Sequence, residues 1–101
     1  NEGARIPEPI LNRMNVYEEV AHIPLFVHDP RAPSAPGETC GALTQTTDLC
    51  ATFLDLFGVA PGPLVDGVPL REARSGARRR DALLYGYFGG AVNVTDGRHT
   101  Y

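Results

Sequence analysis

The fold of this 101-residue chain depends most on residues 47–58, Thr-Asp-Leu-Cys-Ala-Thr-Phe-Leu-Asp-Leu-Phe-Gly. Apolar side chains recur in this stretch at three- and four-residue spacing, which predicts an amphipathic helix with one apolar stripe. The members of the stripe are Leu49, Cys50, Phe53, Leu54 and Phe57. A threonine, Thr46 or Thr47, is expected to cap the helix, and Asp48 suits the positive end of its dipole. We expect Gly58 to end the helix in a left-handed conformation.

The segment before this helix carries a second signal, the apolar run Ile-Pro-Leu-Phe-Val-His at residues 23–28. The run ends at Asp29-Pro30 and is apolar without alternation, so we expect a strand buried on both faces of an α/β sheet. Residues 29–41 hold three prolines and two glycines and predict a surface loop. Apolar positions at helical spacing predict one or two helical turns over residues 13–21.

The second half of the chain is expected to contain two connections followed by strands. Residues 60–70 form a Pro/Gly-rich connection, and residues 71–80 form a charged, Arg-rich stretch. Residues 83–88 predict a strand, and Gly89-Gly90 marks a turn or bulge.

The C-terminal residues predict a β-hairpin. Its arms would be residues 91–94 and 99–101, with the turn at Asp96-Gly97, because Asp-Gly accommodates positive φ. Helix and strands together place the chain in the α/β class.

The composition argues against several classes of partner. The chain is 43% apolar and 21% charged, which is a globular composition. Its formal net charge of −3 gives no reason to expect a nucleic acid or an anionic membrane as partner. No apolar run approaches the roughly 18 residues of a membrane span. We expect at most one domain, with an irregular lead-in over residues 1–10 and one partial α/β domain over residues 11–101.

The order of these segments resembles the later part of a sulfatase, a sulfate-ester hydrolase of the alkaline phosphatase superfamily. The stretches that carry the resemblance are Tyr17-Glu18-Glu19, Ile23-Pro24-Leu25-Phe26-Val27, residues 47–59, Asp66-Gly67-Val68-Pro69-Leu70, Leu84-Tyr85-Gly86-Tyr87-Phe88 and Val94-Thr95-Asp96-Gly97-Arg98. The resemblance implies a fragment of an alkaline-phosphatase/sulfatase-like α/β sandwich, from the C-terminal part of the catalytic domain, that ends in a β-hairpin. It also implies a sulfuric ester hydrolase whose activity belongs to a longer protein.

The reaction centre of that family is not visible in this sequence. The family's nucleophile is a cysteine or serine in a C-x-P-S-R-type motif, converted to formylglycine, and its metal, usually calcium, is held by aspartates and an Asn or Gln. Cys40 precedes Gly-Ala-Leu-Thr and Cys50 precedes Ala-Thr-Phe-Leu, so neither has the proline or the arginine. We therefore predict no catalytic residue and no metal ligand in this chain, and expect calcium and formylglycine only in a full-length protein.

The two cysteines are expected to be structural. Cys50 falls on the predicted apolar stripe, where we expect a buried free thiol. Cys40 follows a Pro/Gly loop and is expected to be partly exposed. A Cys40–Cys50 disulfide is conceivable, but two cysteines define no framework.

One substrate-binding candidate is Arg13. Many sulfatases have a lysine that reaches the substrate's sulfate a few residues before the Tyr-Glu-Glu segment, and Arg13 stands four residues before Tyr17. Its guanidinium would present a forked cation to an oxyanion. Another register places Leu11 at that position, and the structural alternative is a solvated arginine at a helix start.

Other charged or polar patterns have structural explanations. Glu18 and Glu19 are adjacent on a predicted helix and point in different directions, so they cannot easily share a substrate. A zinc site at His22, His28 and Asp29 is disfavoured because neighbouring residues of a strand point to opposite faces.

Two short motifs lie near the C-terminal strands. Residues 78–80, Arg-Arg-Arg, lack interleaved aromatic residues and predict a solvated loop. Asn93-Val94-Thr95 fits a glycosylation sequon by pattern.

The sequence leaves functions of different classes open. The chain is the C-terminal portion of a sulfatase-type hydrolase without nucleophile or metal ligands, or a non-catalytic structural or interaction module derived from one. Part of a related phosphonate or phosphate monoester hydrolase is a further alternative. A partial α/β domain would leave strand edges and a helix face uncovered, so we expect self-association or a partner chain.

Overall fold

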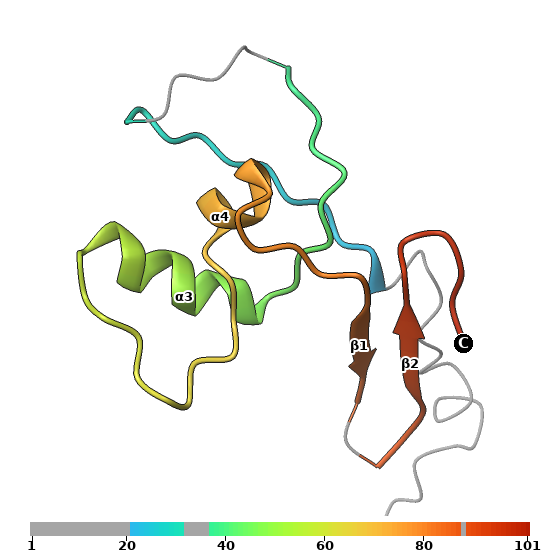
Figure 1. Cartoon of the computed structure of the whole chain (residues 1–101). Helices are drawn as coiled ribbons and strands as arrows, with labels where there is room; N and C mark the ends of the chain where they lie inside the picture. Colours follow the sequence, from blue (N-terminus) through green and yellow to red (C-terminus); the bar gives the residue numbers. More distant parts are fainter. Residues whose placement is uncertain (1–20, 32–36, 88) are drawn as a thin grey trace, which may run out of the picture.

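The computed structural model of the chain describes residues 21–31, 37–87 and 89–101 (Figure 1). In this part of the chain the elements follow in the order α3 (Thr47–Leu56), α4 (Leu70–Ser75), β1 (Leu83–Gly86) and β2 (Val92–Thr95). This mixed content of helix and antiparallel strand is compatible with the α/β class. None of the helices in the described residues is long and apolar enough to cross a membrane.

The helix predicted from residues 47–58 is confirmed as α3, although its N-terminus is built differently from the expectation. Thr46 holds the N-cap position but makes no side-chain capping bond. The carboxylate of Asp48 accepts a hydrogen bond from the backbone N–H of Gln45, which precedes the helix, at 2.9 Å. Thr46 is therefore the N-cap residue, as predicted, but its backbone is helical (φ −61°, ψ −27°) rather than extended, and its side chain makes no capping bond.

Gly58 terminates α3 as predicted, directly after the C-cap residue Phe57. Gly58 has φ +69°, the left-handed conformation that suits a residue without Cβ. Its N–H donates to the carbonyl of Asp55 at 3.2 Å, and the N–H of Val59 donates to that of Leu54 at 2.9 Å. This pair of bonds is the Schellman arrangement, which satisfies carbonyl groups left over at the end of a helix.

The apolar stripe of α3 faces solvent in the described structure, while the opposite side of the helix is buried. Ala51 is 4% exposed and packs in the small core with Val68 and Ala73, whereas Phe53 is 56% and Phe57 is 77% exposed. The core forms on this opposite side of α3 because its side chains, Ala51, Val68 and Ala73, are small. Their size lets the segment that follows α3 approach the helix closely.

Gly67 shows how close that approach is. A Cβ on Gly67 would overlap the backbone carbonyl of Thr47, so only glycine allows residues 65–69 to pass over the start of α3.

The helix α4 was not predicted, since residues 60–70 were expected to be a connection and residues 71–80 a charged stretch. Pro69 precedes its first residue and Gly76, with φ +79°, follows its last. The helix has six residues, and among them only Ala73 is buried. A helix this short offers too little apolar periodicity for its sequence pattern to reveal it.

The predicted C-terminal strands are confirmed. Strands β1 and β2 pair antiparallel with Leu84 opposite Val94, and the Gly89-Gly90 turn joins them. Beyond β2 the chain turns at Gly97, with φ +88°. A bridge between Thr95 and Thr100 then starts the predicted last arm.

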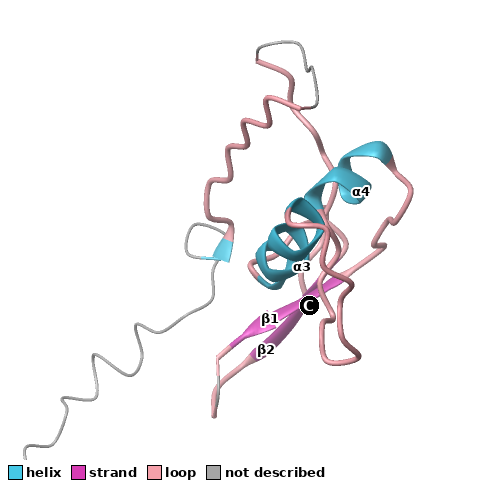
Figure 2. Cartoon of the chain, turned by 90° about the vertical axis from the view of Figure 1, so that its left-hand side faces the viewer, coloured by secondary structure: helices cyan, strands magenta, loops and turns pink. Residues whose placement is uncertain are grey.

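The strand predicted over residues 23–28 is absent from the described structure. These residues follow an extended path with no ladder partner in the described ranges (Figures 1 and 2). Phe26 is 93% exposed, so the expectation of burial on both faces was wrong. Strand hydrogen bonds need a neighbouring backbone, and no described segment supplies one here.

Other predicted segments are described only in part. Of the helix expected over residues 13–21, only the helical Ala21 lies within the described residues. The expected lead-in over residues 1–10 lies outside them, and so does the centre of the 29–41 loop. The described ends of that loop, residues 29–31 and 37–41, contain no helix or strand.

Candidate functional site

The substrate-binding candidate Arg13 lies outside the described residues, and so do Leu11, Glu18 and Glu19. The role of Arg13 therefore stays a prediction.

The two cysteines are free and exposed. The expectation that Cys50 is a buried thiol was wrong, because the stripe that carries it faces outward. The partial exposure expected for Cys40 agrees with the structure, and the conceivable disulfide between the two is not formed.

The metal site of the resembled family was looked for among the described side chains. Within residues 21–31, 37–87 and 89–101, no group of three or more His, Cys, Asp and Glu side chains could hold a metal ion. Asp29, once considered with His22 and His28, is engaged by Arg31 instead.

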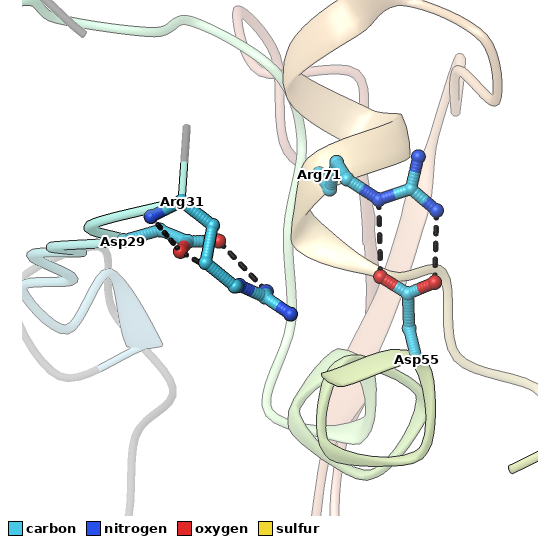
Figure 3. Close-up of a pocket in the computed structure, with 4 residues that line it drawn as sticks. All are labelled: Asp29, Arg31, Asp55 and Arg71. Atoms are coloured by element: carbon cyan, nitrogen blue, oxygen red, sulfur yellow. Dashed lines mark hydrogen bonds and ion pairs between the residues drawn. The ribbon is translucent and has the colours of Figure 1, made fainter. Parts of the chain in front are cut away.

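An open hollow of about 350 Å³ is lined entirely by charged side chains. Figure 3 shows its four lining side chains, Asp29, Arg31, Asp55 and Arg71. Asp55 on α3 and Arg71 on α4 form a two-point ion pair, with Nη2–Oδ1 at 2.8 Å and Nε–Oδ2 at 3.0 Å. Arg31 binds Asp29 in the same way at 2.9 and 3.0 Å, and its side chain extends toward the other pair (Figure 3).

The protonation states in this hollow are fixed rather than poised for proton transfer. The hydrogen bond from Arg31 lowers the pKa of Asp29 from 3.8 to about 2. The hydrogen bond from Arg71 likewise holds the pKa of Asp55 below 3.8. A general base works best when its pKa lies near the operating pH, so neither carboxylate suits that task. Two ion pairs therefore line the hollow, one within residues 29–31 and one that joins α3 to α4.

The strongest polar constellation lies at the start of α3, where Asp48 is fully buried at 0% exposure. Arg80 binds both of its carboxylate oxygens, at 2.6 and 2.5 Å. The backbone N–H of Val68 donates to Oδ1 at 2.8 Å. Burial would raise the pKa of Asp48, but the bonds from Arg80, Val68 and Gln45 outweigh it and hold the pKa below 3.8.

The arginine run at residues 78–80 is therefore only partly solvated. Arg78 and Arg79 are exposed, as expected, but the side chain of Arg80 is 15% exposed and belongs to the buried ion pair. Expecting Arg80 in solvent was wrong. No sequence signal could have found this pair, since Asp48 stands 32 residues earlier.

The glycosylation pattern falls on strand β2. Asn93 pairs with Tyr85 of β1, and its side-chain Nδ2 is buried with no hydrogen-bond partner among the described residues. A glycan acceptor needs an accessible amide nitrogen, so this conformation does not favour modification there.

Comparison with known proteins gives one informative similarity. The chain is similar to an N-acetylglucosamine-6-O-sulfatase of Bacteroides thetaiotaomicron, with 33% identity over 78 residues that cover 72% of this chain. The chain spans 14% of the length of that protein. No protein-family model matches the chain, and no solved structure matches it. The similarity supports a relationship between this chain and sulfatases.

Proposed function

We propose that this chain is the C-terminal portion of the catalytic domain of a sulfatase-type sulfuric ester hydrolase. The observation that carries the proposal is the similarity to the Bacteroides sulfatase. The order of the segments quoted from the sequence, from Tyr17-Glu18-Glu19 to Arg98, agrees with it.

In this proposal the chain supplies scaffold, and the reaction centre belongs to another part of a longer protein. Sulfate-ester hydrolysis needs a nucleophile, and in this family also a metal that gathers the anionic oxygens. Neither cysteine has the sequence context of the nucleophile. Four of the described acidic residues, Asp29, Asp48, Asp55 and Asp96, are held by arginine side chains or backbone N–H groups. Residues 1–101 alone should therefore release no sulfate.

The test is to read the coding frame upstream of Asn1 and to assay the longest in-frame protein. We expect a C-x-P-S-R-type motif upstream, calcium-dependent release of sulfate from N-acetylglucosamine 6-sulfate by the long protein, and none by residues 1–101. The matched control replaces the nucleophile of that motif by alanine, which should abolish release without changing the far-UV circular dichroism.

Two results would overturn the proposal. A start codon beside Asn1 preceded by an in-frame stop would remove the reaction centre. Release of phosphate or of a phosphonate ester product, but not sulfate, would assign the long protein to a related hydrolase of the same superfamily.

A second candidate function is a non-catalytic interaction module derived from a sulfatase. The exposed stripe of α3 favours it, because apolar surface that no described segment covers marks an interaction site. An in-frame stop upstream together with a defined binding partner would favour this second function over the first.

A further inference from the structure

A second hollow, of about 140 Å³, lies among α3, α4 and the connection between them. A cavity of about 150 Å³ holds a molecule of the size of benzene, so this hollow has room for a small organic group. Its polar lining consists of Asp55, Glu72 and Arg78. The apolar part of its wall is formed by Ala51, Val59, Pro61, Val65 and Pro69.

The carboxylates of this hollow differ in their hydrogen bonding. Both oxygens of Asp55 are bound by Arg71, at 2.8 and 3.0 Å. Oε2 of Glu72, in contrast, is buried and has no hydrogen-bond partner among the described residues. Arg78 Nη1 lies 3.8 Å from it, which is beyond hydrogen-bond distance. A buried acceptor without a donor is costly, so this oxygen is a place where a ligand that donates a hydrogen bond would be stabilised.

We propose that this hollow binds a small neutral alcohol, whose hydroxyl group bridges Glu72 and Arg78 and whose carbon atoms cover the apolar wall. The inference rests on the described residues of the hollow and does not depend on the proposed hydrolase function.

The two charged side chains select a hydroxyl group. An ionised carboxylate only accepts hydrogen bonds and a guanidinium only donates them, so an atom that bridges the two must do both. A hydroxyl oxygen does both, whereas an ammonium group has no acceptor and a carboxylate has no donor. Glu72 Oε2 and Arg78 Nη1 are 3.8 Å apart, so one oxygen atom fits between them at about 2.8 Å from each.

The apolar wall favours an alcohol over water. A water molecule could bridge Glu72 and Arg78, but it would leave the neighbouring valines in contact with solvent. Val59 is 52% exposed, and Val65 is half-buried. Carbon atoms attached to the hydroxyl group would cover these side chains, and the removal of apolar surface from water favours binding.

The turn after α4 holds the bridging residues beside each other. The backbone N–H of Arg78 donates to the carbonyl of Glu72 at 3.3 Å, and the Ser75 hydroxyl donates to the same carbonyl at 3.2 Å. Because these bonds are formed without a ligand, less order has to be imposed when a ligand binds.

The test is a titration of the ¹⁵N-labelled 101-residue chain with 2-propanol, followed by the backbone amide signals of Val65 and Glu72. We expect saturable shifts with a dissociation constant in the millimolar range, as suits a ligand of about four non-hydrogen atoms. Acetone has the same carbon skeleton without the O–H donor, and isopropylammonium has it without an acceptor. Each should bind about tenfold more weakly than 2-propanol, because one hydrogen bond to a charged group is lost.

Arg78→Ala should weaken the binding of 2-propanol about tenfold for the same reason. The side chain of Arg78 is 58% exposed, so we expect this variant to fold like the wild type. Arg79→Ala is the matched control, since Arg79 is exposed next to Arg78 and does not line the hollow. It should bind 2-propanol with the wild-type affinity.

Four outcomes would overturn the proposal. Shifts that stay linear in 2-propanol concentration would mean that only water bridges the pair. Isopropylammonium that binds as tightly as 2-propanol would make the hollow a cation site of Glu72. An equal effect of Arg79→Ala and Arg78→Ala would place the binding elsewhere. Binding by residues 1–101 that the longest in-frame protein lacks would mean that a segment of that protein fills the hollow.

Discussion

The carboxylate of Asp48 joins three segments of the chain. It accepts hydrogen bonds from Gln45 before α3, from Val68 in the connection to α4, and from Arg80 before β1. Because Asp48 is fully buried, its charge is stable only while these donors stay in place. One side chain therefore fixes where the connection and the hairpin start relative to α3.

Replacing Asp48 by alanine should unfold much of the structure. The change leaves the Arg80 guanidinium without its partner, and breaking a buried pair costs about 3–5 kcal/mol. Urea denaturation followed by far-UV circular dichroism would measure the loss. Asp81→Ala, at an exposed position, is the control and should unfold at the wild-type midpoint. A midpoint for Asp48→Ala equal to that of the control would contradict the role assigned to this residue.

Gly67 is the second position at which a single residue decides the packing, here because it has no Cβ. An alanine there would place its Cβ against the Thr47 carbonyl, and such overpacking costs about 1–3 kcal/mol. At Gly62 an added Cβ meets nothing within 4 Å, so Gly62→Ala should change stability little. Thermal unfolding of the two variants gives the comparison, and equal melting temperatures would show that residues 65–69 move away from α3 without cost.

At the scale of elements, α3 and α4 are joined by one hydroxyl group and one ion pair. The Thr52 hydroxyl donates to the Asp48 carbonyl at 2.6 Å and accepts the Leu70 N–H at 3.0 Å. The bond from Leu70 gives an acceptor to an N–H group in the first turn of α4, where N–H groups have no acceptor within the helix. The Asp55–Arg71 pair is more solvated, since the Arg71 side chain is 61% exposed, and pairs of this kind contribute about 0–1 kcal/mol.

Thr52→Val should separate the contribution of the Thr52 hydroxyl from that of the Asp55–Arg71 ion pair. Valine has the same shape but neither donates nor accepts, so we expect a loss of about 1 kcal/mol or more and faster hydrogen exchange at the Leu70 amide. Thr52→Ser keeps the hydroxyl and serves as the control. Unchanged exchange at Leu70 in the valine variant would show that α4 is held by its other contacts.

At the scale of the whole molecule, acid should weaken the structure through several aspartates. The pKa of Asp48 lies below 3.8 in the folded chain, so its contribution to stability is present above the unfolded pKa and is lost as pH falls through the folded one. Asp29 and Asp96, each with a pKa of about 2, act in the same direction, and both side chains are more solvated than that of Asp48.

We therefore expect the free energy of unfolding to be flat between about pH 5 and pH 7 and to fall below about pH 4. Urea midpoints at a series of pH values would measure this dependence. Asp48→Asn should show a shallower fall, since its side chain does not titrate. The same slope in both proteins would mean that the other aspartates, and not Asp48, carry the acid sensitivity.

Across the described part of the molecule, small apolar side chains are buried and large ones are exposed. Ala51, Val68 and Ala73 are buried, while Phe26, Phe53 and Phe57 are more than half exposed. In the described residues the core is therefore built from small groups near α3 and α4. The remainder of the proposed longer sulfatase would give the large side chains a cover.

Local signals in the sequence were sufficient for the elements whose cause is local. The periodicity of residues 47–58 predicted α3, and Gly58 its end, because helix formation depends on residues within one or two turns. The turns at Gly89-Gly90 and Gly97 followed from the conformational freedom of glycine.

Tertiary structure alone decided which face of α3 is buried, whether residues 23–28 pair as a strand, and which partner Arg80 binds. Periodicity shows that a helix has an apolar side, but a close approach such as that of Gly67 determines which side receives the next segment. The Asp48–Arg80 pair joins residues 32 positions apart, and such contacts depend on the path of the whole chain. The sequence by itself therefore determined α3, the C-terminal turns and the likeness to sulfatases, while packing over long separations determined the core and the buried Asp48–Arg80 pair.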